Sequence, residues 1–347
     1  MFGASTSVEP ASAASAPDWA AVWRRAGATG VVRLDDGRWL VASPDAVAAV
    51  LGAEAASVVP AGEVVDRVGG LQRRMARFSD GADHGRRRAA VVELLDAADP
   101  VVVEQRAAEL TTRWLDGRDS PDAMALAREV PARVLAEALG LDGRTVAPVI
   151  DGLCRRLAPM LGAVDRPDPD EVADAVTAAF GPLDDETVVA RVSILFQAMD
   201  ATAALIGVAA RRLLGGHGRI ERSDVERVAR SEPPVQLTVR RLLEDVSVGS
   251  TTIPAGSDVV VGLAAAELAG GPGTGDGPVP WTFGRGPHRC PGAAQAGAIT
   301  AGVLGALAAA GAHLVDQPIE HEPRPNLRTP ASLTVTLRSG SDPAGDR

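Results

Sequence analysis

The chain has 347 residues and a formal net charge of −10 at pH 7, which excludes the basic surface that nucleic-acid-binding proteins carry. Its length is sufficient for one large hydrophobic core or two smaller ones. Two cysteines give no disulfide framework and predict a reducing, cytoplasmic environment. No segment is predicted to be a signal peptide or a membrane-spanning helix. Lysine and tyrosine are absent, which excludes a lysine Schiff base and a tyrosine acid.

The first half of the chain is predicted to be helical apart from a short hairpin. Two β-rich runs flank Asp35-Asp36-Gly37, a sequence typical of a hairpin turn. The helical segments show apolar residues at helical spacing. The predicted segments are a disordered Ala/Ser-rich segment (1–17), the beginning of a helix (19–26), a hairpin (30–43) and two helices (83–95 and 122–139), the second bent at Pro131.

The second half is predicted to contain a long central helix and a few strands. Asp184 or Asp185 can cap this helix, which runs to about Leu214 and is apolar on nearly every face. The other segments are a short helix (223–230), strands (246–253 and 258–263), a Gly/Pro-rich linker (268–280) and a long helix (293–314). The predicted fold class is therefore mainly α with a small β portion. We expect a single domain over residues 18–340, followed by a tail at 341–347.

Residues 283–292, with the sequence FGRGPHRCPG, place Cys290 behind a glycine-rich turn and before a helix. The free N–H groups and the dipole of a helix N-terminus stabilise a thiolate, which is the form of cysteine that binds metals. Pro291 suits the first helical position, where no N–H is needed. Gly284 and Gly286 permit a tight turn whose backbone approaches a bound group closely. The segment is therefore expected to provide a thiolate ligand.

Two other roles for Cys290 are a buried structural cysteine and a zinc site shared with His288. Zinc sites need three or four ligands, and no others cluster in this segment. Cys154 lies in an apolar run and is expected to be an ordinary core residue.

The same segment matches Phe-Gly-x-Gly-x-His-x-Cys-x-Gly, the haem-ligand loop of the cytochrome P-450 family, at six defining positions. The chain resembles a bacterial, soluble, shortened and divergent member of that family from about residue 20 to its end. The resemblance implies the cytochrome P-450 fold with trimmed meander and roof segments. It implies haem b (iron protoporphyrin IX) as cofactor, Cys290 as the ligand of its iron, and Phe283, Gly284 and Gly292 beside the haem. A thiolate ligand pushes electron density onto the iron and favours cleavage of an O–O bond.

The resemblance also implies cationic partners for the two haem propionates. His84 and Arg88 are one turn apart on a predicted helix and share a face, as in the family pair that binds a propionate. A solvated face is the alternative, because three arginines are contiguous there. Arg240, which follows residues 233–236 (PPVQ), stands where family members place another propionate-binding arginine, and His288 is a third expected contact.

The central helix departs from the family pattern at the oxygen site. Ala198 supplies the small residue that leaves room for a diatomic ligand, and Asp200 supplies the acid. Ala201 occupies the position of the oxygen-activating threonine, and Thr202 follows it. Gln197 either contacts substrate or water or is bonded within the helix. Similar helices occur in enzymes that act on carrier-protein-bound amino acids, so a carrier-bound substrate is one expectation.

A second departure concerns Arg230, the arginine of the family's Glu-x-x-Arg motif. The glutamate position holds Arg227, and Glu226 is one residue out of register, about 100° away around a helix. The meander that provides the third member of this triad is reduced to residues 268–280. Both partners of Arg230 are therefore expected to be lost together.

The main functional hypothesis is a haem-thiolate monooxygenase-like oxidase of bacterial secondary metabolism that acts on a small organic or carrier-bound substrate. Asp200 takes part in proton delivery in this hypothesis, with Gln197, Ala201 and Thr202 at the same site. Electrons come from a ferredoxin and ferredoxin reductase docking near Arg285 and Arg289.

Two alternatives stay open. The first is a peroxide-using or non-oxygenating haem enzyme that performs a rearrangement or cyclisation, and the alanine at position 201 favours it. The second is a degenerate binding or scaffold member, which the altered surroundings of Arg230 favour. Against the scaffold hypothesis, every haem-contacting position that the resemblance identifies is present.

Overall fold

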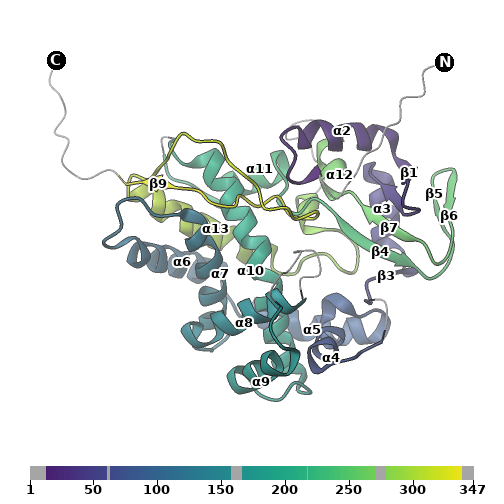
Figure 1. The fold of residues 1–347 in the computed structure, drawn as a ribbon, viewed down its shortest axis with the longest axis horizontal. Coiled ribbons are helices and arrows are strands. Elements are labelled where there is room, and N and C mark those ends of the chain that lie inside the picture. Colours follow the sequence, from purple (N-terminus) through teal and green to yellow (C-terminus); the bar gives the residue numbers. More distant parts are fainter. Residues whose placement is uncertain (1–12, 61–62, 158–165, 217, 270–278, 338–347) are drawn as a thin grey trace.

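The computed structural model describes residues 13–60, 63–157, 166–216, 218–269 and 279–337 (Figure 1). Helices make up most of the molecule; strands β1 and β3 to β7 lie at one side of it, and β9 lies at the opposite side. The helices are α2 (Trp19–Thr29), α3 (Pro44–Gly52), α4 (Arg67–Arg74), α5 (Gly81–Asp96), α6 (Pro100–Leu115), α7 (Ala123–Ala138), α8 (Gly143–Leu157), α9 (Pro169–Phe180), α10 (Glu186–Leu213), α11 (Arg222–Ser231), α12 (Leu263–Ala269) and α13 (Ala293–Ala309), with short 3-10 turns η1 (Ala76–Phe78) and η2 (Trp281–Phe283). The predicted fold class, mainly α with a small β portion, is confirmed.

Side-chain caps determine where several helices begin. Asp185 caps α10 by accepting hydrogen bonds from the backbone N–H groups of Thr187 and Val188, at 2.7 and 3.1 Å. Helices α3, α6 and α9 each begin with proline directly after a capping Ser or Asp. Pro131 lies inside α7, where it removes one helical hydrogen bond.

The strands form one five-stranded sheet and two small ribbons. The sheet has the order β1-β2-β7-β4-β3, in which only the β2–β7 pair is parallel. The strands are β1 (Val31–Arg33), β2 (Trp39–Val41), β3 (Ala56–Ser57), β4 (Thr238–Leu242), β5 (Val246–Val248), β6 (Thr251–Ile253), β7 (Asp258–Val261), β8 (His313–Leu314) and β9 (Val335–Thr336). The predicted hairpin at 30–43 is confirmed as β1 and β2.

Helix α10 runs through the middle of the molecule and packs against α5, α7 and α13 (Figure 1). It is long and apolar enough to cross a membrane, which the sequence analysis did not expect, with a mean hydropathy of 1.7 over its most apolar window. However, 72% of that window is buried inside the protein. Its apolar surface is therefore used in the core.

Three sequence predictions are corrected by the structure. Ala13 and Ala14 are buried, and the Ala14 carbonyl accepts a hydrogen bond from Arg328 at 2.8 Å, so residues 13–17 are not disordered. The predicted strand at 246–253 is a hairpin of two strands, because Gly249 turns the chain with φ of +59°. The helix predicted at 293–314 ends at Ala309, and residues 313–314 form a strand beyond Gly311, which has φ of +68°.

The remaining domain predictions lie partly outside the described residues. Residues 1–12 and the predicted tail at 341–347 are outside them, as is most of the predicted linker, residues 270–278. A single domain over 18–340 stays a prediction.

Candidate functional site

The Cys290 loop, residues 281–292, is closed by its own backbone. The N–H of Gly284 donates to the Trp281 carbonyl at 2.8 Å, and the N–H of Cys290 donates to the Phe283 carbonyl at 2.8 Å. Gly286 has φ of +69°, and a Cβ there would lie 2.2 Å from the Leu51 carbonyl oxygen. This position therefore accepts only glycine.

The helix after the loop begins slightly later than expected. α13 begins at Ala293 with Gly292 as its N-cap, so Pro291 precedes the helix and does not occupy its first position. A Cβ on Gly292 would meet Leu95 at 3.7 Å, an ordinary contact, and both residues line the large cavity described below.

Cys290 is held in surroundings that act on its thiol in opposite directions. Burial raises the pKa of the Cys290 thiol, while the backbone N–H of Gly292 and the cations of Arg88, Arg77 and Arg289 lower it. The helix-end N–H and the cationic neighbours expected from the sequence are therefore both in place. A metal cation at the sulfur would favour the thiolate further.

A cavity of about 340 Å³ lies between the Cys290 loop and α10. Its volume falls in the range of sites for small organic ligands, which is roughly 300–1,000 Å³. Every residue that the sequence analysis assigned to the site lines this cavity: His84, Arg88, Gln197, Ala198, Asp200, Ala201, Thr202, Arg240, Phe283, Gly284, His288, Cys290 and Gly292. The fold thus brings together residues from α5, α10, β4 and the loop.

Two histidines meet at the edge of the cavity. The rings of His84 and His288 lie with their centroids 3.9 Å apart, and His288 Nε2 is 3.4 Å from Asp80 Oδ1. Burial, followed by the charges of His84 and Arg240, lowers the pKa of His288 to about 4. Burial and Arg88 also lower the pKa of His84. At neutral pH His288 is therefore an uncharged hydrogen-bonding group.

Two arginines supply fixed positive charge. Arg240 is 5% exposed on β4 and donates to Thr238 Oγ1 and to the Val239 carbonyl, both at 2.9 Å. Burial lowers its pKa to about 10, so it is still a cation at neutral pH. Arg88 is half-buried and donates to the Arg289 carbonyl at 2.8 Å. Both guanidinium groups line the cavity.

Arg77 is a cavity cation that the sequence analysis missed. It lies in η1, and its guanidinium is 5.7 Å from the centre of the Phe78 ring. It is close enough to Cys290 for the two groups to interact electrostatically. The available signal was one arginine between the apolar residues Ala76 and Phe78.

The α10 face of the cavity holds an acid that is already paired. Asp200 Oδ2 accepts a hydrogen bond from Arg324 Nη1 at 2.6 Å, and Arg324 Nε lies 2.6 Å from Glu322 Oε2. Neither Arg324 nor Glu322 was expected here, because Arg324 is 124 residues away from Asp200 in the sequence. The acid of α10 is therefore positioned by the segment between β8 and β9.

The other α10 residues combine small size with limited polarity. Ala198 and Ala201 present methyl groups to the cavity, and Thr202 lines it while being 3% exposed. Gln197 donates from Nε2 to Ser193 Oγ at 2.8 Å and to the Ser193 carbonyl at 3.1 Å. Gln197 is thus hydrogen-bonded within the helix and also lines the cavity. Its role as a contact for substrate or water and its role within the helix therefore both stay open.

The family's glutamate is absent, as expected, since Arg227 stands at its position, but Arg230 has two other acidic partners. Arg230 Nη2 donates to Glu226 Oε1 at 2.9 Å, because residues four apart lie on the same face of a helix. Its Nη1 lies 3.3 Å from Oε1 of Glu267, which belongs to α12. The sequence analysis placed Glu226 about 100° out of register with the family's glutamate, but residues four apart on a helix are still close enough to pair.

Cys154 is buried, as expected, with its sulfur 3.7 Å from the Phe196 carbonyl oxygen and 3.9 Å from Met199 Sδ. In the part of the chain that the structure describes, no group of three or more His, Cys, Asp or Glu side chains could hold a metal ion. A zinc site of three protein ligands that includes Cys290 and His288 is therefore not formed by these residues.

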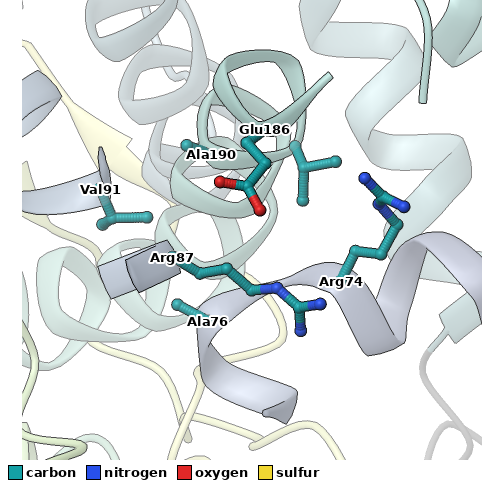
Figure 2. Close-up of a pocket in the computed structure, with 7 residues that line it drawn as sticks. Arg74, Ala76, Arg87, Val91, Glu186 and Ala190 are labelled. Atoms are coloured by element: carbon teal, nitrogen blue, oxygen red, sulfur yellow. The ribbon is translucent and has the colours of Figure 1, made fainter. Parts of the chain in front are cut away.

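A second pocket, between α5 and the beginning of α10, has a volume of only about 10 Å³. Figure 2 shows Arg74, Arg87 and Glu186 around it, with Ala76, Val91 and Ala190 forming its apolar wall. Such a volume holds about one water molecule.

The donor set of the large cavity fits an iron porphyrin with two carboxylates. Cys290 is a soft ligand for iron, and Arg88 and Arg240 are cations that suit carboxylates. The apolar faces of Phe283, Ala198 and Ala201 suit a flat ring system. The sulfur, the cations and the apolar faces of the cavity therefore agree with the haem that the resemblance implies.

No protein-family model matches the chain, and no curated protein matches it in sequence. Solved structures do match. The heme domain of the Tepidiphilus thermophilus P450 has a TM-score of 0.76 at 18% identity, covering 95% of this chain and 96% of that one. P450 OxyD, described as involved in the biosynthesis of vancomycin-type antibiotics, has a TM-score of 0.74 at 23% identity, covering 94% and 98%.

P450BioI, solved in complex with an acyl carrier protein ligated to hexadec-9Z-enoic acid, has a TM-score of 0.74 at 18% identity and covers 92% and 98%. The likeness extends over nearly the whole length of each chain. The chain therefore has the cytochrome P450 fold.

Proposed function

We propose that the protein is a haem-thiolate oxidoreductase of the monooxygenase type, with haem b bound between the Cys290 loop and α10. The observation that carries this proposal is the position of Cys290. Its sulfur lies in a cavity of about 340 Å³, among the cations expected to bind carboxylates and opposite a helix that offers Asp200 and Thr202. The bound haem would supply the oxidising power, and the protein would supply its ligand, its anchors and the protons.

The residues of the chain have separable roles in this proposal. Cys290 would ligate the iron, and the Gly292 N–H would stabilise the charge on the sulfur. His84, Arg88, Arg240 and His288 would hold the two propionates. Asp200 would hold or move protons above the haem. Its position is determined by Arg324, so this step depends on a contact from the C-terminal segment.

A spectrum of the purified protein tests the proposal. We expect the protein to take up haem and, when it is reduced under carbon monoxide, to give the absorption band of a thiolate-ligated haem. A protein that binds no haem, or binds it without the thiolate band at neutral pH, contradicts the proposal. Spin-state shifts on adding small organic molecules then provide a screen for substrates.

We also propose that the substrate belongs to bacterial secondary metabolism and is a small organic or carrier-bound molecule. The similarity of the fold to OxyD and to the P450BioI complex with an acyl carrier protein supports this class. The test is the spin-state shift caused by a carrier-linked acyl or aminoacyl group and by the same group released from its carrier. A stronger shift for the released form contradicts presentation by a carrier.

One observation favours the peroxide-using or non-oxygenating alternative. Ala201 places a methyl group in the cavity where family members have a threonine hydroxyl, and Arg324 pairs with the neighbouring acid. Product formation with peroxide and without any reductase would support this alternative. An Ala201→Thr variant that gains at least about tenfold in reductant-driven turnover would favour the monooxygenase.

The electron donor is proposed to be a ferredoxin with its reductase, docking on the Cys290 side. Arg289 is exposed there, whereas Arg285 is half-buried and donates to the carbonyls of Val279 and Gly284. Arg289 is therefore the better candidate for an intermolecular contact. Replacing Arg289 with glutamate should slow reduction by a ferredoxin but not by dithionite.

A further inference from the structure

Glu267 joins two structural elements through separate oxygen atoms. Its side chain is 1% exposed, at the C-terminal part of α12. Oε1 lies 3.3 Å from Arg230 Nη1 on α11. Oε2 accepts a short hydrogen bond from the backbone N–H of Trp281, the first residue of the Cys290 loop. The carboxylate therefore connects the loop to α11.

The contact at Trp281 continues to the cysteine through hydrogen bonds of the backbone. The Trp281 carbonyl accepts from the Gly284 N–H, and the Phe283 carbonyl accepts from the Cys290 N–H, both at 2.8 Å. The 3-10 turn η2 lies between them. A displacement of Trp281 is thus passed to the turn that carries the sulfur.

Arg285 holds the other side of the same residue. Its guanidinium lies 4.3 Å from the centre of the Trp281 ring and donates to the carbonyls of Val279 and Gly284, at 2.5 and 3.0 Å. Its charge also interacts with that of Glu267. The Trp281 ring and the Trp281 backbone are therefore held by opposite charges from different elements.

Because Glu267 is buried, the charge of its carboxylate is stabilised mainly by its hydrogen-bond and ion-pair partners. Burial raises the pKa of the Glu267 carboxyl, and the Trp281 N–H and Arg230 both lower it. Removing the carboxylate would leave Arg230, whose side chain is 13% exposed, with a weakened set of acceptors. By contrast, Glu226 is 49% exposed and pairs with Arg230 without touching the loop.

We propose that Glu267 is the positioning residue of the Cys290 loop, which it joins to α11 through Arg230 and the Trp281 N–H. This inference rests on the proposed role of Cys290 as the haem thiolate. It also explains how the chain retains a paired Arg230 although the glutamate of the family's Glu-x-x-Arg motif is replaced by Arg227.

The test compares two glutamates that share Arg230 but differ in their contact with the loop. Haem-loaded wild type, Glu267→Gln and the matched control Glu226→Gln are examined for the rate of haem transfer to excess apomyoglobin. They are also examined for the fraction of thiolate-type band when reduced under carbon monoxide. Glu267→Gln should lose haem about tenfold faster and lose much of the thiolate-type band, as expected for one charged hydrogen bond at the loop. Glu226→Gln should behave like wild type in both measurements.

Several outcomes would overturn the inference. The inference fails if Glu267→Gln matches wild type in both the rate of haem transfer and the fraction of thiolate-type band. It also fails if Glu267→Gln changes these two quantities no more than Glu226→Gln does. If Glu267→Gln does not fold, Glu267→Asp replaces it, because aspartate keeps the charge but is one methylene shorter. Glu267→Asp must then lose haem faster than Glu226→Gln. If wild type itself shows no thiolate-type band, the proposed function fails; if only the variants fail to differ, the inference about Glu267 fails alone.

Discussion

The floor and the roof of the cavity are built in different ways. The floor, defined as residues 281–292 with His84, Arg88 and Arg240, is held by local turns and by cations that project from neighbouring elements. The roof, defined as residues 197–202 of α10 with Arg324, has its acid paired to a distant segment and alanine at position 201. The floor matches the family pattern at every motif position, whereas the roof departs from it.

This difference assigns cofactor binding to the floor and proton transfer to the roof. In the proposed function the floor binds a haem through a thiolate, and its loop is joined to α12 and α11 through Glu267. In the proposed function the roof would deliver protons, and its acid is held by a contact between α10 and the segment before β9. Variants of the floor should therefore affect cofactor binding, and variants of the roof should affect stability and proton transfer.

The largest effect is expected for Cys290→Ser in the floor. Serine removes the soft sulfur ligand and keeps the size of the side chain. The variant should lose the thiolate-type band completely when reduced under carbon monoxide. Cys154→Ser, at a sulfur buried beside Phe196 and Met199, should keep it. A thiolate-type band in Cys290→Ser would show that the floor is not the haem site.

The next effect is expected for Arg240→Leu, with Arg241→Leu as its matched control. Arg240 is buried and lines the cavity, whereas Arg241, its neighbour on β4, is exposed and pairs with Asp258 at 2.8 Å. Loss of one charged hydrogen bond to a propionate should raise the rate of haem loss by about tenfold. Arg241→Leu should leave that rate unchanged. Equal rates of haem loss in the two variants would show that Arg240 does not bind a propionate.

A smaller effect is expected for Arg324→Gln in the roof. The variant leaves Asp200 and Glu322 without their shared cation, so the free energy of unfolding should fall by about 1–3 kcal/mol. The matched control is Arg227→Gln, which breaks an ion pair with Asp224 at a side chain that is 67% exposed. Its cost should be below about 1 kcal/mol in urea denaturation. Haem retention should stay close to wild type in both variants.

The last effect concerns pH and the floor histidines. The pKa of His288 is about 4 in the folded chain and about 6.5 in an unfolded one, so the unfolded chain binds more protons between these values. The stability supplied by the neutral imidazole is therefore fully present above about pH 6.5 and is lost as the pH falls towards 4. Urea denaturation of cofactor-free protein at several pH values measures this. A His288→Gln variant should lose less stability over that range, and an unchanged slope would contradict the assignment.

Much of the fold was predictable because its signals are local. The hairpin at 30–43, the capped central helix and the short helix before Pro233-Pro234 all follow from turn residues, caps and periodicity within a few residues. The errors also have local causes. Gly249 turns a predicted strand into a hairpin, and Gly311 lies just after a helix that was predicted to be longer. Ala13 and Ala14 are buried, although the composition of their segment is typical of disorder.

The candidate site also has a part that local sequence predicts and a part that it does not. The cysteine loop and its tight turn were predictable from ten consecutive residues, because a turn needs only neighbouring atoms, although the helix after the loop begins at Ala293 and not at Pro291. The partners Arg324, Glu267 and Arg77 were not. Arg324 meets Asp200 across 124 residues and Arg230 meets Glu267 across 37, and nothing in an arginine or a glutamate marks which distant charge it will pair with.

The sequence by itself thus determined the Cys290 loop and the helical class, since each depends on short-range geometry, and the resemblance of the loop to a family motif supplied the haem-thiolate hypothesis. Only the tertiary structure decided that Asp200 is paired, that Arg230 keeps two acidic partners and that Glu267 connects α11 to the loop. These facts depend on how helices pack. A buried charge must be compensated by whichever opposite charge the packing places within reach.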